Sequence, residues 1–251
     1  MKDESIYQKA ADLINKANKI VFFGGAGVST ESGIKDFRSK DGLSSMRFAN
    51  NMSYEEILSH ECYLYHSDIF FDFYRNYMIS FDAKPNFAHE FLAKLENYKD
   101  LAIVTQNIDG LHQKAGSKHV YELHGSVLRN YCTHCHKFYD LDSFLKLGDI
   151  PTCPICHHTV KPDVVLFGES LDTSTLTYAA KLVSECDLLI VAGTSLQVFP
   201  AAMLVDYYEK SDIICINKDS INLGTTSNVL MFNEKVGEVF KKIDKYINYK
   251  K

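Results

Sequence analysis

The sequence predicts an α/β protein in which helices cover both faces of a parallel β-sheet, with two inserted segments. Three observations support this class. Short apolar runs alternate with amphipathic, helix-length segments along most of the 251 residues, four cysteines cluster where the alternation breaks, and the composition is globular, with 46% hydrophobic and 24% charged residues. No apolar run approaches the ~20 residues that span a bilayer, so we expect no membrane association.

The predicted elements begin with a helix in the first 18 residues, where Ile6 to Ala17 show apolar positions at helical spacing. A buried strand follows at 20–23. The same cycle then recurs, with helices expected at 87–98, 173–184, 201–209 and 236–247 and strands at 101–105, 188–192 and 213–217. Strands joined by helices of this length form parallel sheets that are covered on both faces.

Two segments interrupt this alternation. Residues 34–79 begin as a loop and continue, from Tyr54 to Met78, as an aromatic-rich stretch that we expect to be helical. Residues 126–162 hold four cysteines and several turn residues but little helical periodicity, which indicates a small inserted module. Neither insertion follows a flexible linker, so we expect both to pack against a main domain formed by residues 1–33, 80–125 and 163–251.

The inserted module carries a metal-binding pattern. Cys132-x-x-Cys135 and Cys153-x-x-Cys156 are separated by 17 residues, a spacing typical of two knuckles that close a tetrahedral zinc site. Four thiolates leave no open coordination position, so we expect one structural Zn²⁺ per chain. The alternative is two redox-active pairs, which is disfavoured because neither pair opens a helix in a thioredoxin-like arrangement.

Polar or glycine-rich turns follow four predicted strands. Gly24–Thr30 would let backbone N–H groups approach a phosphate, although a purely structural turn is an equal alternative because glycine-rich turns are common. The usual dehydrogenase fingerprint fails, since Thr30 stands where it has a third glycine. Thr105–Gly110 offers groups that could hold a ribose and a carboxamide, or could cap the turn. Gly193–Ser195 and Asn217 end two further strands. Since ligands bind at the carboxyl ends of parallel strands, the four turns together predict one site.

His124 follows a short predicted strand at the border of the cysteine module. An imidazole titrates near ~6.5 and can exchange a proton at neutral pH, although a single histidine is often structural. The net charge of −5 disfavours nucleic acid as a partner. A zinc-ribbon adaptor without catalytic activity is the alternative from another class, and the convergent polar strand ends argue against it.

These segments resemble the sirtuin family, the NAD-dependent protein-lysine deacylases. The resemblance covers nearly the whole chain in the family's order: Gly25–Ser29, Ser32–Arg38, Thr105–Asp109, His124-Gly125, the four cysteines, Val164–Glu169, Gly193–Ser195 and Ile216-Asn217. Two departures are visible, Lys35 in place of the usual proline and Lys161 in place of an arginine that often precedes Pro162. Neither removes a group needed for chemistry. The short ends resemble those of bacterial or archaeal members.

The resemblance implies a Rossmann-like NAD-binding domain with a zinc-ribbon module and a helical insertion, and an acyl-lysine peptide that meets NAD between them. It implies two catalytic residues, His124 as general base and Asn107 as the group that orients the ribose or a water. The implied NAD-binding residues are Ala26, Thr30, Phe37, Arg38, Gln106, Ile108, Asp109, Thr194, Ser195, Asn217 and Val236. The implied peptide-binding residues are Val164, Val165, Phe167, Gly168 and Glu169, and the implied zinc ligands are Cys132, Cys135, Cys153 and Cys156.

The implied reaction removes acetyl and other uncharged acyl groups from protein lysines and gives nicotinamide, free lysine and 2′-O-acyl-ADP-ribose. Sirtuins that prefer succinyl or malonyl groups resemble one another in carrying an arginine three residues after a tyrosine. Here Tyr77 stands three residues after Tyr74, and we expect Arg75 to point elsewhere. Protein ADP-ribosylation stays open as a side activity. From the composition, the charge and the short apolar runs we expect a cytoplasmic protein that binds neither a specific nucleic acid nor a membrane. We also expect a monomer.

Overall fold

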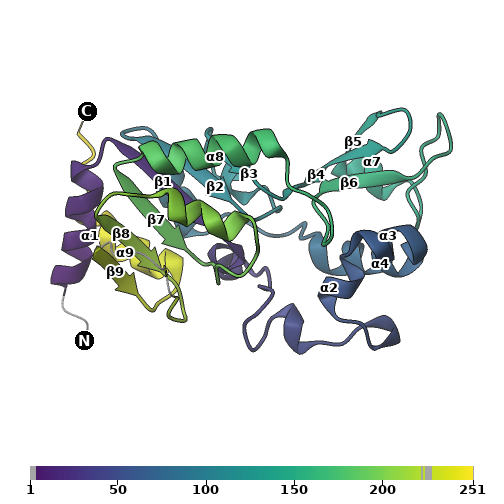
Figure 1. The fold of residues 1–251 in the computed structure, drawn as a ribbon, viewed down its shortest axis with the longest axis horizontal. Coiled ribbons are helices and arrows are strands. Elements are labelled where there is room, and N and C mark those ends of the chain that lie inside the picture. Colours follow the sequence, from purple (N-terminus) through teal and green to yellow (C-terminus); the bar gives the residue numbers. More distant parts are fainter. Residues whose placement is uncertain (1–3, 222, 224–227, 251) are drawn as a thin grey trace.

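The computed structural model describes residues 4–221, 223 and 228–250 (Figure 1). Its larger part is a six-stranded parallel sheet in the order β3-β2-β1-β7-β8-β9. The strands are β1 (Lys19–Gly24), β2 (Asp100–Thr105), β3 (Val120–Glu122), β7 (Leu188–Ala192), β8 (Asp212–Ile216) and β9 (Asn228–Phe232). This strand order is that of the Rossmann fold, and it confirms the predicted class. Residues 1–3, 222, 224–227 and 251 of the predicted main domain lie outside the described residues.

Helices cover both faces of this sheet. The helices α1 (Ser5–Lys16), α5 (Phe87–Leu95) and α9 (Val236–Asp244) share one core with Ile20 and Phe22 of β1. On the other face, α8 (Thr173–Glu185) and the 3₁₀ helix η6 (Ala201–Tyr207) pack against Val21 and Phe23 (Figure 1). Because successive side chains of a strand point to opposite faces, the apolar run 20–23 supplies both cores.

Two α-helices end earlier than predicted, and the helix expected at 201–209 is the 3₁₀ helix η6, which ends at Tyr207. We expected helices to residues 98 and 247, whereas α5 ends at Leu95 and α9 at Asp244. In both places the chain continues with tighter i→i−3 hydrogen bonds, for example from Tyr98 N to Leu95 O at 2.9 Å and from Tyr246 N to Ile243 O at 2.9 Å. The apolar periodicity therefore extends past the regular α-helix.

The two insertions form a second lobe, at the right of Figure 1. Its strands β4 (Gly125–Cys132), β5 (Phe138–Asp140) and β6 (Val160–Val164) make an antiparallel sheet in the order β5-β4-β6. Separately, the strand β9 of the main sheet was missing from the predicted strands. Aromatic side chains from residues 54–74 share a buried core with Tyr139 and Phe144 of the cysteine module. The ring centroids of Phe144 and Tyr74 lie 6.2 Å apart. The insertions thus pack against each other, which was not predicted.

The first insertion is helical, as predicted, but in short pieces: α2 (Tyr54–Ile57), α3 (His60–Tyr65), α4 (Ser67–Phe73) and the π-helical turn η5 (Tyr74–Met78). Ser53 caps α2 in a capping box with Glu56, and the Ser59 hydroxyl accepts from the Cys62 amide at 3.0 Å to begin α3. The remaining short helices are α6 (Leu111–Lys114), α7 (Leu141–Leu145) and the 3₁₀ turns at 26–28, 30–32, 43–45 and 49–51. None of the described helices is long and apolar enough to cross a membrane.

Candidate active site and cysteine cluster

Two loops at the carboxyl ends of the neighbouring strands β1 and β2 are joined by three polar side chains. Asn107 Nδ2 donates to Ser29 Oγ at 3.1 Å, and Ser29 Oγ donates to Asp109 Oδ2 at 2.6 Å. Ser29 and Asn107 are buried. Ser29 was not among the predicted site residues, although it lies in the glycine-rich turn that drew attention to this loop. The sequence could not show that it meets residues about 80 positions later.

The glycine-rich turn after β1 packs tightly against the turn after β7. Gly27 N donates to Gly193 O at 2.8 Å, and a Cβ on Gly27 would lie 2.7 Å from the Gly193 Cα. The close packing of these two turns therefore requires glycine whether or not a phosphate binds, which supports the alternative that the turn is structural. The predicted NAD-binding residues Ala26 and Thr30 remain partly accessible beside it, half-buried and exposed respectively.

Other predicted NAD-binding residues lie along the same edge of the sheet. Gln106 Nε2 donates to Thr194 Oγ1 at 3.3 Å, and this hydrogen bond joins the ends of β2 and β7. Ser195, the next residue after Thr194, is half-buried. Asn217 lies after β8, where its amide donates to the Asp219 carbonyl at 2.8 Å. Val236 begins α9 and is buried.

Three predicted NAD-binding residues remain. Ile108 is partly buried against the core of the second lobe, and Phe37 and Arg38 lie in the loop that leads to this lobe. Phe37 packs on Tyr54, with ring centroids 5.3 Å apart, and Arg38 is exposed. The structure thus groups most predicted residues at the ends of β1, β2 and β7. Phe37 and Arg38 instead belong to the side of the second lobe.

His124 lies between β3 and β4, where the chain passes from the sheet to the second lobe. Its Nδ1 lies 2.9 Å from the Gln106 carbonyl oxygen. A carbonyl can only accept a hydrogen bond, so Nδ1 carries the proton and Nε2 is left as the basic nitrogen. Burial lowers the pKa of His124 below its usual 6.5, and the bond to Gln106 only partly opposes this. The imidazole is therefore neutral at pH 7.

The predicted peptide-binding segment, Val164–Glu169, leaves β6 directly beside His124. Val165 N donates to the His124 carbonyl at 3.0 Å. The N–H and C=O of Phe167 both bond to the junction of α2 and α3, so its backbone is already occupied, while its side chain is 38% exposed. The backbone of Gly168 makes no hydrogen bond within the described residues and is exposed.

Glu169 holds this segment together from inside. Its Oε2 accepts from Leu166 N at 2.9 Å and from Lys161 Nζ at 3.1 Å, and its Oε1 lies 2.8 Å from His60 Nδ1. Burial opposes its ionisation, but these partners together lower the pKa of Glu169. Lys161, a departure from the family pattern, thus keeps a cation in contact with this carboxylate.

The four predicted zinc ligands converge at the tip of the second lobe. Their sulfur atoms all lie within 4.8 Å of one another, and the closest pairs join the two knuckles, Cys132 to Cys156 at 3.3 Å and Cys135 to Cys153 at 3.7 Å. Tetrahedral zinc with Zn–S bonds of ~2.3 Å needs sulfurs ~3.8 Å apart, so the cluster fits this ion. A disulfide needs ~2.05 Å, and all seven cysteines are free.

Both knuckles have the same backbone geometry. His136 and His157, each directly after the second cysteine of its knuckle, adopt left-handed φ values of 57° and 61°. Their amides donate to the carbonyls of Cys132 and Cys153, at 3.1 Å and 2.9 Å. The nearby His134 and His158 stack with ring centroids 4.2 Å apart and, with Cys156, form a second group of potential ligand atoms. Both of these rings are exposed, and the four thiolates alone complete a tetrahedral set.

Comparison with known proteins agrees with this architecture. Residues 25–200 match the model of the Sir2 family. The chain is 51% identical to an NAD-dependent protein deacetylase of Clostridium acetobutylicum over 235 residues, 92% of this chain and 95% of the relative. It is 48% identical to the protein of the same name from Clostridium perfringens over 237 residues, 94% of this chain and 97% of the relative.

Solved structures agree as well. A Sir2 structure with a deacetylated p53 peptide and 3′-O-acetyl-ADP-ribose is similar with a TM-score of 0.87 and 34% identity, over 95% of this chain and 97% of that one. A structure of Sir2 with a p53 peptide and NAD⁺ has a TM-score of 0.81 and 35% identity, over 94% and 96%. With the matched parallel sheet, strand-end loops and cysteine knuckles, this chain belongs to the Sir2 family.

Proposed function

We propose that this protein is an NAD-dependent protein-lysine deacetylase that transfers the acyl group to ADP-ribose. The observation that carries the proposal is the placement of His124. Its neutral imidazole donates through Nδ1 to the Gln106 carbonyl, and its backbone carbonyl accepts from Val165 N in the peptide-binding segment. A base in this position contacts the loops proposed for both substrates. The names of the relatives and the ligands of the solved Sir2 structures support the same activity.

The residues at the strand ends fit NAD as the second substrate. When bound, NAD supplies a ribose carbon that can be attacked and nicotinamide as the leaving group. The linked side chains of Ser29, Asn107 and Asp109 offer hydroxyl, amide and carboxylate groups for a ribose and a carboxamide. The turns at Gly25–Ser29 and Gly193–Ser195 lie where Rossmann folds bind a dinucleotide. The other NAD-binding residues that the family resemblance implies, among them Ala26 and Val236, are proposed to contact NAD in those roles.

His124 is proposed to remove a proton from a ribose hydroxyl through Nε2. A general base near neutral pKa contributes typically ~10²–10⁴-fold in rate, because it is unprotonated yet basic enough at working pH. Asn107, fixed by Ser29, would orient the ribose or a water. Val165 and Gly168 would pair with the peptide backbone by β-augmentation, which tolerates varied peptide sequences.

We expect the rate of deacetylation to fall only on the acid side of neutrality. The base form of His124 is the active one, and burial lowers its pKa below 6.5, so the base stays available through pH 7 and is lost as the pH falls through that lowered pKa. A pH profile of kcat/KM for peptide, with zinc content checked at each point, measures this. An activity that rises steeply between pH 7 and 8 would contradict the assignment.

Acetyl and longer aliphatic acyl groups are expected to be substrates, and succinyl a poor one. Arg75 Nη1 donates to the Leu145 carbonyl at 3.3 Å and Nη2 donates to the Gly148 carbonyl, so this cation is held within the cysteine module. Tyr77 stacks on Phe73 at 4.8 Å between ring centroids. A buried acyl carboxylate would then lack a cation, which is unfavourable by several kcal/mol.

One peptide that carries acetyl, butyryl or succinyl lysine tests this preference directly. The related structure of Sir2Tm with a propionylated peptide shows that an uncharged longer acyl group fits that protein. A succinyl rate equal to the acetyl rate would show that another cation reaches the acyl site.

The remaining features complete the proposal. One Zn²⁺ would stabilise the second lobe without contact to substrate. The domain boundaries would be those expected from the sequence, with residues 34–79 and 126–162 as the two insertions in the NAD-binding domain. Seven free cysteines suit a reducing compartment, which supports a cytoplasmic location. We propose a monomer that uses acylated proteins, and no specific nucleic acid, as partners.

The activity is tested by measuring nicotinamide release from NAD with an acetylated peptide and with the same peptide unacetylated. Release that requires both NAD and the acetyl group is expected. A zinc-ribbon adaptor would release none, and equal release with both peptides would point to simple NAD hydrolysis.

A further inference from the structure

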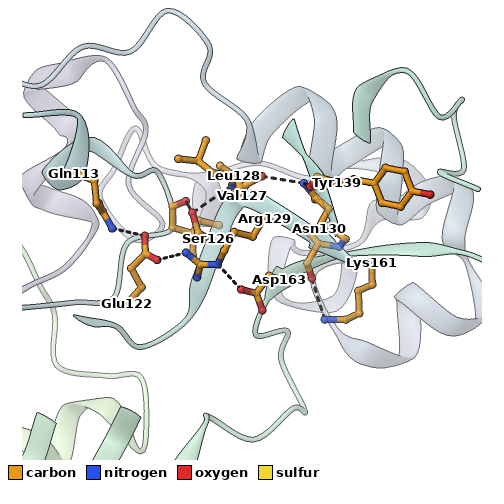
Figure 2. A network of polar contacts seen from close by, with 12 residues as sticks. Gln113, Glu122, Ser126, Val127, Leu128, Arg129, Asn130, Tyr139, Lys161 and Asp163 are labelled. Carbon is orange, nitrogen blue, oxygen red and sulfur yellow. Dashed lines mark hydrogen bonds and ion pairs between the residues drawn. The ribbon is translucent and has the colours of Figure 1, made fainter. Parts of the chain in front are cut away.

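Arg129 links two segments of the site that are far apart in the sequence. Its Nη1 donates to Glu122 Oε2 at 2.7 Å and its Nε donates to Asp163 Oδ2 at 2.8 Å (Figure 2). Glu122 ends β3 two residues before His124, and Asp163 comes directly before Val164 in β6. We propose that Arg129 is a positioning residue that fixes the base His124 relative to the peptide-binding segment; this inference rests on the proposed function.

The Glu122 carboxylate is held from both sides. Gln113 Nε2 donates to its Oε1 at 2.9 Å, while Arg129 occupies Oε2 (Figure 2). The Glu122 side chain is only 8% exposed, whereas those of Arg129 and Asp163 are 39% and 42% exposed. Charge-assisted bonds of this length, with one partner largely desolvated, are stronger than ordinary surface ion pairs. Glu122 is thus bonded at once to α6 of the larger lobe, through Gln113, and to β4 of the second lobe, through Arg129.

The backbone of β4 is irregular where Arg129 lies. β4 pairs with β6 at Ser126 with Asp163 and again at Asn130 with Pro162, so the β4 residues between these points form a bulge with no partners on β6. Bulges bend a strand and often lie next to active sites. Here the ladder that would hold β4 against β6 is interrupted, and the Arg129 ion pair with Asp163 spans the interruption.

The bulge also brings β4 onto the proposed NAD loop. Val127 N donates to the Ile108 carbonyl at 3.0 Å, and Ser126 is buried beside it. On the other side, Gly125 pairs with Val164. A Cβ on Gly125 would lie 1.9 Å from the Asp163 carbonyl, and its φ is +77°, so this approach requires glycine. The chain around His124 is therefore closely packed. Replacement of Arg129 would remove one of the few side-chain contacts that hold this part of the chain in place.

The test is Arg129→Gln, which keeps hydrogen-bonding groups but removes the charge. We expect kcat/KM for an acetylated peptide to fall about 10- to 100-fold, because small displacements of a catalytic group have effects of this size. The peptide KM should rise and kcat should fall, while the KM for NAD should change much less than the KM for the peptide. Partial unfolding would lower kcat alone. Arg129→Lys should recover part of the loss, since an ammonium can pair with one carboxylate at a time.

A double-mutant cycle with Glu122→Gln separates this role from general stability. If Arg129 acts through Glu122, the double variant should lose no more than Arg129→Gln alone. Lys181→Gln, which removes an exposed ion pair with Glu185 on α8, is the matched control and should have wild-type kinetics. A loss in the double variant equal to the product of the two single losses would overturn the proposal.

Amide hydrogen exchange gives a readout that needs no activity. In Arg129→Gln the amides of Val127 and Val165 should exchange faster, while that of Cys132, which bonds within its knuckle, should not change. Wild-type protein that releases no nicotinamide would refute the proposed function, and exchange would still decide whether Arg129 holds these segments. Unchanged kinetics or unchanged exchange in Arg129→Gln, in an active wild-type background, would overturn the inference.

Discussion

Replacement of His124 by alanine is expected to lower the rate of deacetylation by about 10²–10⁴-fold without loss of fold or zinc. The side chain makes one hydrogen bond, to the Gln106 carbonyl, and it is only half-buried, so its truncation removes little stabilising contact. What it removes is the single neutral imidazole proposed to take a proton from the ribose. Asn107→Ala should behave similarly, because it removes the ribose-orienting amide itself, together with its hydrogen bond to Ser29.

The measurement is steady-state turnover at saturating NAD and acetylated peptide, with circular dichroism and zinc content recorded for each protein. His119→Ala is the control, because His119 is an exposed histidine paired with Glu96 before β3. It removes an imidazole from outside the site and should leave turnover unchanged. Near-normal turnover by folded His124→Ala would disprove the assignment of the base.

Removal of the metal is expected to unfold the second lobe and abolish activity indirectly. Cys132 and Cys153 are fully buried in the core that both insertions share, so the loss of their common ligand would expose that core. Structural zinc sites contribute apparent binding free energies of ~10–16 kcal/mol in small domains, and that energy is folding energy. The Rossmann-like sheet has its own cores and should remain folded.

Zinc content by elemental analysis and exchange protection of residues 125–164 measure this effect after chelation and in Cys153→Ser. Cys62→Ala, which changes a buried cysteine outside the cluster, should retain one zinc per chain. Well below one zinc per chain in active, natively purified protein would refute the structural role.

The sheet was predictable because its central strands are continuous apolar runs. The strand Leu188–Ala192 has all five residues buried, and the prediction matched its bounds. β9 was missed because it lies at the edge of the sheet and is mostly half-buried, so it lacks a strong apolar run. The five-residue helix α7 is too short to show periodicity. The shared core of the insertions depends on contacts between residues 54–74 and 127–166, which no local pattern reveals.

The candidate site was predictable where residue type and strand position coincide, as at Asn107 and His124. The carboxyl ends of parallel strands meet at one edge, so polar residues there could be expected to converge. Ser29 and Arg129 could not be identified in this way. The partners of Ser29 lie 78 and 80 positions away from it in the sequence, and Asp163 lies 34 positions from Arg129. The contact between Arg129 and Asp163 also depends on the bulge in β4.

The central claim is best tested by identifying the products formed from NAD and one acetyl-lysine peptide. Mass spectrometry should find nicotinamide, deacetylated peptide and O-acetyl-ADP-ribose in equal amounts, with no product when either substrate is omitted. ADP-ribose attached to a peptide that keeps its acetyl group would instead show protein ADP-ribosylation. Free acetate formed without consumption of NAD would contradict the account altogether.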